Sequence, residues 1–238
     1  MFPGLCKIQS MIRFLFILAA AMSLPCGAAQ AQQISGEVDL FEMHLGSGDD
    51  HFVFDGEVQA GDRHGATFKL SGGSDLGPRI DEVTAQALYT FRPREGAALM
   101  AGVRHDLREG GNLTLGVLAV TADLGEIVSA EHFLFVSEDG DVTGEAMALA
   151  ALPLSQKLTL EPRAEFAWSA QRVPGEELAS GVTEVTLSAR LRHAIGPMVN
   201  VYLGAIHERL VGGTRRIARA RGDPGHVTRA VIGAGLAF

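Results

Sequence analysis

Histidines and methionines are the side chains of this sequence whose types could do chemistry. Imidazole nitrogens and thioether sulfurs bind transition-metal ions, and the chain carries eight histidines and seven methionines. No pair of them has the H-x-x-x-H, H-x-H or M-x-x-M spacing that would predict a local metal motif. The only adjacent pair is Met43-His44, and in a strand these two side chains point to opposite faces. Any metal site must therefore be assembled from separate elements.

Six of these residues are the candidate metal ligands of the sequence, and they are Met43, His44, His51, Met100, His105 and Met147. No catalytic constellation accompanies them, because neither a G-x-S-x-G nor an H-x-S context is present. We therefore expect a protein that is not an enzyme.

The elements that must position these residues are predicted to be strands. Apolar and polar residues alternate through the chain, most clearly from Leu158 to Trp168, where Glu161, Arg163 and Glu165 share one face. Glycine-rich turns separate the alternating runs. The runs are centred on 34–45, 51–61, 66–72, 80–92, 97–106, 112–122, 126–137, 141–152, 157–169, 181–193, 198–209 and 227–238. No stretch has a convincing helical period, so we predict an all-β antiparallel barrel of about twelve strands, within a range of 10–14.

The first residues have the features of an export signal. Lys7 and Arg13 precede a short apolar run, and Ala29-Gln30-Ala31 supplies a cleavage site. We expect residues 1–31 to be a secretory signal peptide and residues 32–238 to form one domain. Both cysteines lie in the predicted signal, so no disulfide is expected in the domain. The net charge of −8 argues against a nucleic acid as partner.

Alternation alone leaves two readings, a secreted soluble β-barrel that binds a small ligand and an outer-membrane barrel whose outside faces lipid. The end of the chain favours the membrane. Ile232, Ala234, Leu236 and Phe238 share one face, with glycines on the other. A terminal aromatic residue on an alternating strand is typical of chains recognised by the outer-membrane assembly machinery. We therefore predict the cell outer membrane as location, with its lipid bilayer and that machinery, through Phe238, as partners.

From about residue 80 the sequence resembles the copper resistance protein B (CopB) family of bacterial outer-membrane proteins. The resemblance rests on ordered short stretches, of which the run Gln156–Glu165 is the most specific; others are Ala101–Asp106 and His207-Glu208-Arg209. It implies an outer-membrane barrel that serves copper homeostasis and resistance by sequestration or passage of copper. It also implies copper as the ligand and a periplasmic multicopper oxidase as a candidate partner.

One feature of that family is missing where it is expected. Family members usually carry a segment rich in methionine and histidine between signal and barrel, whereas here the first predicted strand follows almost directly after Ala31. This difference leaves open an alternative function, a general narrow channel or structural barrel that has lost its dependence on copper.

Each candidate ligand also has an explanation without a metal. Met43 and His44 fit the edge of a barrel, and His105, with His193 and His207, fits an outward-facing ring near a strand end. Met100 and Met147 are expected to face the lumen near Arg104 and Glu145, where methionine commonly fills gaps. Exposure beside loops explains His51, His64 and His226, which could instead form a weak site at one rim. The charges of 161–165 and 184–192 are expected inside the barrel, as ion pairs or as a pore lining.

Overall fold

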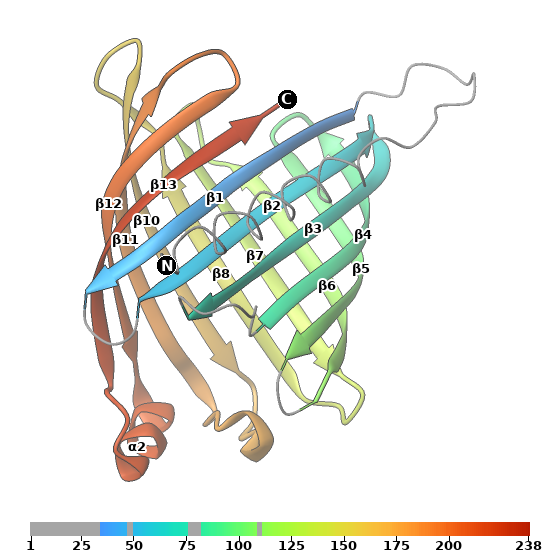
Figure 1. The fold of residues 1–238 in the computed structure, drawn as a ribbon. Helices are drawn as coiled ribbons and strands as arrows, with labels where there is room; N and C mark the ends of the chain where they lie inside the picture. Colours follow the sequence, from blue (N-terminus) through green and yellow to red (C-terminus); the bar gives the residue numbers. More distant parts are fainter. Residues whose placement is uncertain (1–33, 47–49, 76–81, 109–110) are drawn as a thin grey trace, which may run out of the picture. The chain divides into compact units, whose positions relative to one another are not determined.

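The computed structural model describes residues 34–46, 50–75, 82–108 and 111–238, and the predicted signal peptide lies outside these ranges. The described residues belong to one compact unit, a closed antiparallel barrel (Figure 1). Within the described ranges, none of the helices has the length and apolar character needed to span a bilayer.

Twelve long strands and the two-residue β9 build the barrel wall. They are β1 (Ile34–Gly46), β2 (His51–Gly61), β3 (His64–Asp75), β4 (Glu82–Arg94), β5 (Ala97–Arg108), β6 (Leu113–Asp123), β7 (Val128–Ser137), β8 (Val142–Ala150), β9 (Leu152–Pro153), β10 (Leu158–Ser169), β11 (Gly181–Ala194), β12 (Val199–Leu210) and β13 (His226–Ala237). Each long strand pairs with its neighbour in the chain, and β1 pairs with β13 to close the cylinder. The predicted class, strand number and strand positions are confirmed.

The last residue takes part in that closure. The amide of Phe238 donates to the carbonyl of Gly36, and the amide of Gly36 donates back to Phe238, both at 2.9 Å. On the inner face, Gly233 and Gly235 leave room for Tyr202 and Arg192, since a Cβ added at either glycine would meet those side chains within 3 Å. This packing explains why β13 has glycines on its inner face and apolar residues on its outer face, as the sequence predicted.

The outer surface of the barrel is apolar, which separates the two readings left open by the sequence. Outward-facing residues of many strands are large, hydrophobic and half exposed, among them Phe68 (57%), Leu118 (59%), Leu187 (53%) and Leu203 (62%). A soluble barrel would expose its polar face, whereas lipid favours this arrangement. The apolar belt supports the membrane reading.

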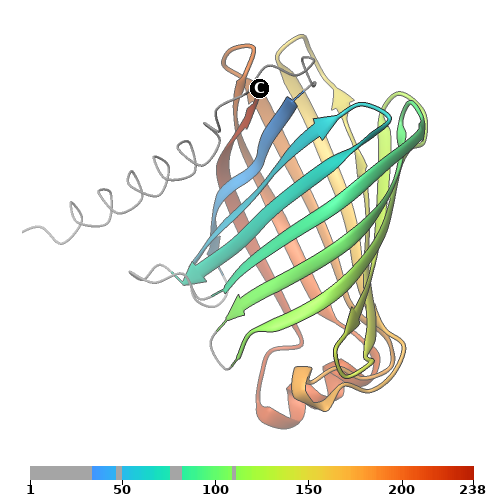
Figure 2. The same cartoon turned by 90° about the vertical axis from the view of Figure 1, so that its right-hand side faces the viewer.

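The two ends of the barrel differ in their connections. Residues 62–63, 95–96 and 195–198 make tight turns at the end that holds Phe238, while the longer segments 170–180 and 211–225 lie at the opposite end (Figures 1 and 2). Outer-membrane barrels have short periplasmic turns and longer extracellular loops. The end with the longer segments is therefore the extracellular one.

These longer segments contain helices that the sequence did not predict. The 3-10 helix η1 (Pro174–Glu176) lies between β10 and β11, and α2 (Gly212–Arg221) lies between β12 and β13. Helix α2 has no side-chain N-cap, and its only buried residues are the small Thr214 and Ala218. It therefore has neither the capping signal nor the apolar stripe from which a helix is predicted.

The interior is polar only in part. The inner faces of β4 to β7 form an apolar cluster of Leu88, Met100, Leu115, Val117, Ala119, Phe133 and Phe135. Because these side chains fill one side of the barrel, the open space and the charged groups are displaced towards the remaining strands.

Candidate functional site

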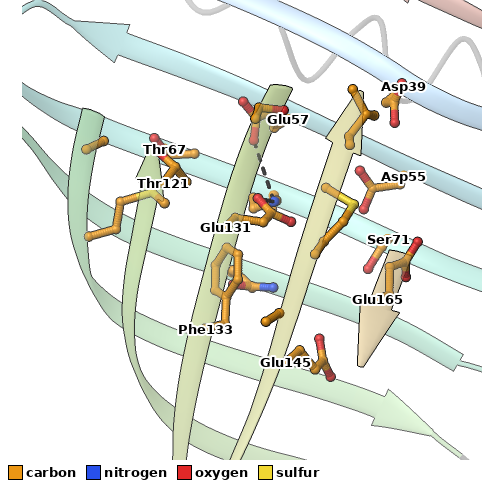
Figure 3. Close-up of a pocket in the computed structure, with 18 of the residues that line it drawn as sticks. Asp39, Asp55, Glu57, Thr67, Ser71, Thr121, Glu131, Phe133, Glu145 and Glu165 are labelled. Atoms are coloured by element: carbon orange, nitrogen blue, oxygen red, sulfur yellow. Dashed lines mark ion pairs between the residues drawn. The ribbon is translucent and has the colours of Figure 1, made fainter. Parts of the chain in front are cut away.

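A cavity of about 1550 Å³ occupies the lumen beside the apolar cluster. Carboxylates outnumber basic side chains along its wall, and several of them point into one space (Figure 3). The acidic residues are Glu37, Asp39, Asp55, Glu57, Asp62, Glu82, Glu95, Asp123, Glu131, Glu145, Glu161, Glu165 and Glu184; the basic ones are Arg63, Lys69, Arg92, Arg94, Arg104 and Arg163. Such a lumen attracts cations and repels anions.

Lys69 lies among these carboxylates, with its charge at the centre of the cavity. Its Nζ is 3.7 Å from Glu57 on the neighbouring strand β2 and 3.9 Å from Glu131 on β7, which lies across the lumen. The same ammonium is 4.9 Å from the centroid of the Phe133 ring, a cation–π distance. Lys69 therefore contacts both the acidic wall and the apolar cluster.

Arg104 makes a second connection of the same kind. Its guanidinium donates to Asp106 at 2.8 Å, lies 3.5 Å from Glu145 on β8, and is 4.8 Å from the Phe135 ring centroid. Met100 and Met147 line the cavity, as the sequence predicted. The strands that carry them, β5 and β8, also carry Arg104 and Glu145. Methionine side chains and charged side chains therefore line the same lumen.

A denser group of ion pairs joins β1 to β10 and β11, past β12 and β13, which lie between them in the wall. Arg190 donates to both carboxylate oxygens of Glu42, at 2.7 and 2.9 Å, and the two residues are 2% and 1% exposed. Asp39 accepts from Arg163 at 2.7 Å and from Arg192 at 2.6 Å. The predicted lumenal charges of β10 and β11 are therefore inside, and their partners come from the first strand.

An irregularity in β1 explains how that strand supplies both partners. The pairing registers with β2 and β13 shift between Val38 and Phe41, so Glu37 before the shift, Asp39 within it and Glu42 after it all face inward. Strict alternation would place Asp39 and Glu42 on opposite faces. A β-bulge of this kind redirects side chains into a site.

The extracellular mouth holds the two candidate histidine ligands that the structure brings together. His44 and His51 are paired across β1 and β2 and line a pocket of about 350 Å³ with Glu208 and Arg229. The Nε2 of His44 shares a 2.7 Å hydrogen bond with Glu42, and the Nε2 of His51 lies 2.9 Å from a guanidinium nitrogen of Arg229. Directly opposed residues have Cβ atoms about 5 Å apart, so both imidazoles reach this pocket.

The remaining candidates are not part of that group. Met43 is 38% exposed on the outer face, opposite in direction to His44 as predicted. His105 also faces outward and shares a 2.9 Å hydrogen bond with Thr114. His64, which pairs with Phe91 beside the periplasmic turn, is at the other end from His51 and His226, so the single rim site suggested for these three does not form. The six predicted ligands therefore do not make one site.

Among the residues that the structure describes, no three histidine, cysteine, aspartate or glutamate side chains are grouped to enclose a metal ion. Instead, the imidazoles of His44 and His51 lie together at the extracellular mouth, and the lumen below them is acidic. Imidazoles suit both copper oxidation states, and thioethers suit Cu(I). These donors fit transient contacts with a cation better than a closed coordination sphere.

Several residues of the lumen were missed by reasoning on the sequence, namely Glu37, Asp39, Glu42, Asp55, Lys69, Glu131, Glu208 and Arg229. A signal for Lys69 was available, because a lysine in the middle of a membrane strand must face the lumen. Asp39 and Glu42 had none, since the bulge that turns them to one side has no marker in the sequence.

Comparison with solved structures places this fold among outer-membrane channels. The NanC porin superposes with a TM-score of 0.53 at 10% identity, covering 85% of this chain and 98% of that one. The KdgM porin gives 0.51 at 9% identity, covering 86% and 99%. An outer-membrane channel from Pseudomonas putida F1 gives 0.50 at 12% identity, covering 91% and 97%. At these identities the likeness concerns the fold.

Comparison of sequences is more specific. A copper resistance protein B homologue from Pseudomonas syringae pv. tomato (strain ATCC BAA-871 / DC3000) is 25% identical over 168 residues, which are 71% of this chain. The match spans only 57% of the length of that relative. Residues 33–238 match the family described as copper resistance protein B precursor (CopB). With its apolar belt and predicted export signal, the protein is located in the outer membrane, and the chain belongs to the copper resistance protein B family.

Proposed function

We propose that the lumen takes up copper ions at the cell envelope and contributes to copper resistance in this way, without catalysing a reaction. The observation that carries the proposal is the excess of carboxylates along the 1550 Å³ cavity. A lumen of one sign with low-dielectric walls concentrates ions of the opposite sign. Membership of a copper resistance family supports copper as the cation concerned.

Copper is distinguished from other cations by selective binding at the extracellular mouth. A copper ion that enters from outside first meets the imidazoles of His44 and His51. Imidazole binds copper more strongly than it binds alkali or alkaline-earth ions. Beyond the mouth, carboxylates and the thioethers of Met100 and Met147 are available along the cavity. The ion is then retained in the lumen or passes through it.

The test is complementation of a strain that lacks this gene. We expect the wild-type protein to restore growth at raised copper concentration, and the variant His44→Ala/His51→Ala to restore it only in part. The matched control is His105→Ala/His207→Ala, which removes two imidazoles from the outer face and should complement fully. Equal loss in both double variants, or no copper phenotype in the deletion strain, would contradict the proposal.

Retention and passage are separated by two measurements on the purified barrel. Titration calorimetry with Cu(I) and with Cu(II) reports retention, for which binding at micromolar or lower concentration is expected. Copper flux into vesicles that contain the barrel reports passage. Flux without binding identifies a conduit, and binding without flux identifies a store.

A general narrow channel is the second candidate. It is favoured by the lack of a closed metal-binding group in the described ranges of the chain. Such a channel would conduct potassium and copper alike. An unchanged copper content of cells with and without the gene, together with measurable potassium conductance, would favour this candidate over the first.

A further inference from the structure

Three arginines lie together at the extracellular end of the barrel, away from the lumen. Arg215 and Arg219 are one turn apart on α2, and both cover Gly225: a Cβ added there would be 3.0 Å from Nε of Arg215 and 3.5 Å from Nε of Arg219. Arg209, at the end of β12, is paired with His226, the residue that follows Gly225. The positive charges of Arg219 and Arg209 lower the pKa of Arg215.

This arginine cluster (Arg209, Arg215 and Arg219) is on the outer side of the barrel wall. Glu208 lines the pocket at the mouth of the lumen, so the next residue, Arg209, faces outward. The rings of His207 and His226 are 6.0 Å apart on the same outer face. Further along the same two strands, Leu203 and Ile232 belong to the apolar belt. The cluster therefore lies at the extracellular border of the membrane.

The cluster has no acidic partner in the part of the chain that the structure describes. Three other arginines at this end are paired: Arg221 of the same helix with Glu177, Arg229 with Glu208, and Arg108 with Glu176. No salt bridge joins any described carboxylate to the cluster, and the covered Nε–H of Arg215 has no acceptor among the described residues. Three close positive charges with an unused buried donor are the features of an anion site.

We propose that the arginine cluster binds the phosphate groups of a lipid in the outer leaflet of the membrane. Guanidinium groups bind phosphate through paired, charge-assisted hydrogen bonds. The apolar belt below the cluster accommodates acyl chains, so the ligand that fits both features is a phosphorylated lipid rather than free phosphate. In a bacterial outer leaflet, lipopolysaccharide presents phosphates at this depth. The site is separate from the lumen and does not depend on copper.

The experiment measures binding of lipopolysaccharide to the purified full-length barrel in detergent. We expect the variant Arg215→Gln/Arg219→Gln to bind about tenfold or more weakly than wild type, because two charge-assisted contacts are lost. The matched control is Arg172→Gln/Arg216→Gln. It removes two exposed arginines from the same end of the barrel, outside the cluster, and should bind as wild type does.

Two further ligands identify what is recognised. Dephosphorylated lipopolysaccharide should bind wild type and the cluster variant equally weakly, and inorganic phosphate at millimolar concentration should not compete with the intact lipid. Equal affinity of wild type and cluster variant for intact lipopolysaccharide would overturn the proposal, as would an equal loss in the control. Full competition by inorganic phosphate would show that the cluster is a site for the free anion and would exclude the lipid. Thermal unfolding of each variant without lipid shows whether the barrel is intact.

Discussion

At the scale of single residues, the interior is organised by charges that have specific partners. Glu42 and Arg190 are both almost completely buried, and Arg190 donates two hydrogen bonds to Glu42, which also shares a hydrogen bond with His44 at the mouth. Taking a charge out of water is costly unless a partner of opposite sign is present. This pair therefore couples the position of His44 to the ion pairs of the wall.

The substitution Glu42→Gln is expected to lower the free energy of unfolding by about 3–5 kcal/mol, because it leaves the buried charge of Arg190 without its carboxylate partner. Urea titration of the barrel in lipid vesicles measures this change. The double variant Glu42→Met/Arg190→Met, which removes both charges, should be about as stable as wild type. A loss in the double variant as large as in Glu42→Gln would show that shape rather than charge is responsible.

We expect Lys69 to affect a different property, the selectivity of the lumen between cations and anions. The variant Lys69→Met removes the ammonium between Glu57 and Glu131 and leaves these carboxylates uncompensated. We expect the permeability ratio of potassium to chloride to rise roughly twofold or more. Reversal potentials in a salt gradient across planar bilayers measure the ratio. Lys157→Met, at an exposed periplasmic turn, is the control and should leave it unchanged.

At the scale of elements, the segment 170–180 is tied across the extracellular mouth. Arg108, at the end of β5, donates to both carboxylate oxygens of Glu176 in η1, at 2.5 and 2.6 Å. The strands β6, β7 and β8 separate these two elements along the wall. The segment also holds buried Val173 and its bridge to Leu178, so its own contacts and the ion pair together fix it at the extracellular end.

This attachment should depend on pH. The hydrogen bond from Arg108 lowers the pKa of Glu176 below its usual 4.5. A lowered pKa in the folded state adds stability above the unfolded value, and that stability is lost as the pH falls through the folded value. We therefore expect the amides of Val173 and Leu178 to be protected at pH 7 and to lose protection below the usual pKa.

Hydrogen exchange, corrected for the intrinsic effect of pH on the rate, measures that loss. Glu176→Gln should exchange faster already at pH 7 and show no further change on acidification. The control Glu126→Gln alters an exposed carboxylate at the opposite end and should behave as wild type. Protection of this segment that is independent of pH in the wild type would contradict the assigned role of the ion pair.

At the scale of the whole molecule, stability depends on a bilayer around the apolar belt. Leu118 in the middle of β6 is 59% exposed, and Leu154 in the periplasmic turn is 58% exposed. These two leucines have the same accessibility and differ in their depth in the membrane. They therefore test where the lipid lies.

Leu118→Lys should destabilise the barrel in lipid vesicles by about 2–4 kcal/mol, because the ammonium is placed near the bilayer midplane. Leu154→Lys should cost about 0–1 kcal/mol, because its side chain is at the interface. Urea unfolding in the same vesicles compares the two. Equal costs would show that the belt is not surrounded by lipid at the level of Leu118.

Local patterns of the sequence were sufficient to predict the strands, the turns between them and the inward direction of the charges on β10 and β11. Alternation has a period of two residues, so the sequence of each strand alone indicates which of its side chains point inward. On β6 and β7 the same rule was ambiguous, since Val117 and Leu118, or Phe133 and Leu134, are apolar on both faces. The apolar cluster inside the barrel could therefore not be predicted.

The sequence by itself determined the barrel and the residues available to bind a cation, whereas the tertiary structure decided which of them meet. His44 and His51 share the mouth because β1 and β2 pair in one register, and Asp39 and Glu42 share the lumen because a bulge interrupts β1. The arginine cluster likewise requires α2 to fold back over the end of β13. Register, bulges and closure depend on contacts between distant segments, and a local pattern does not contain them.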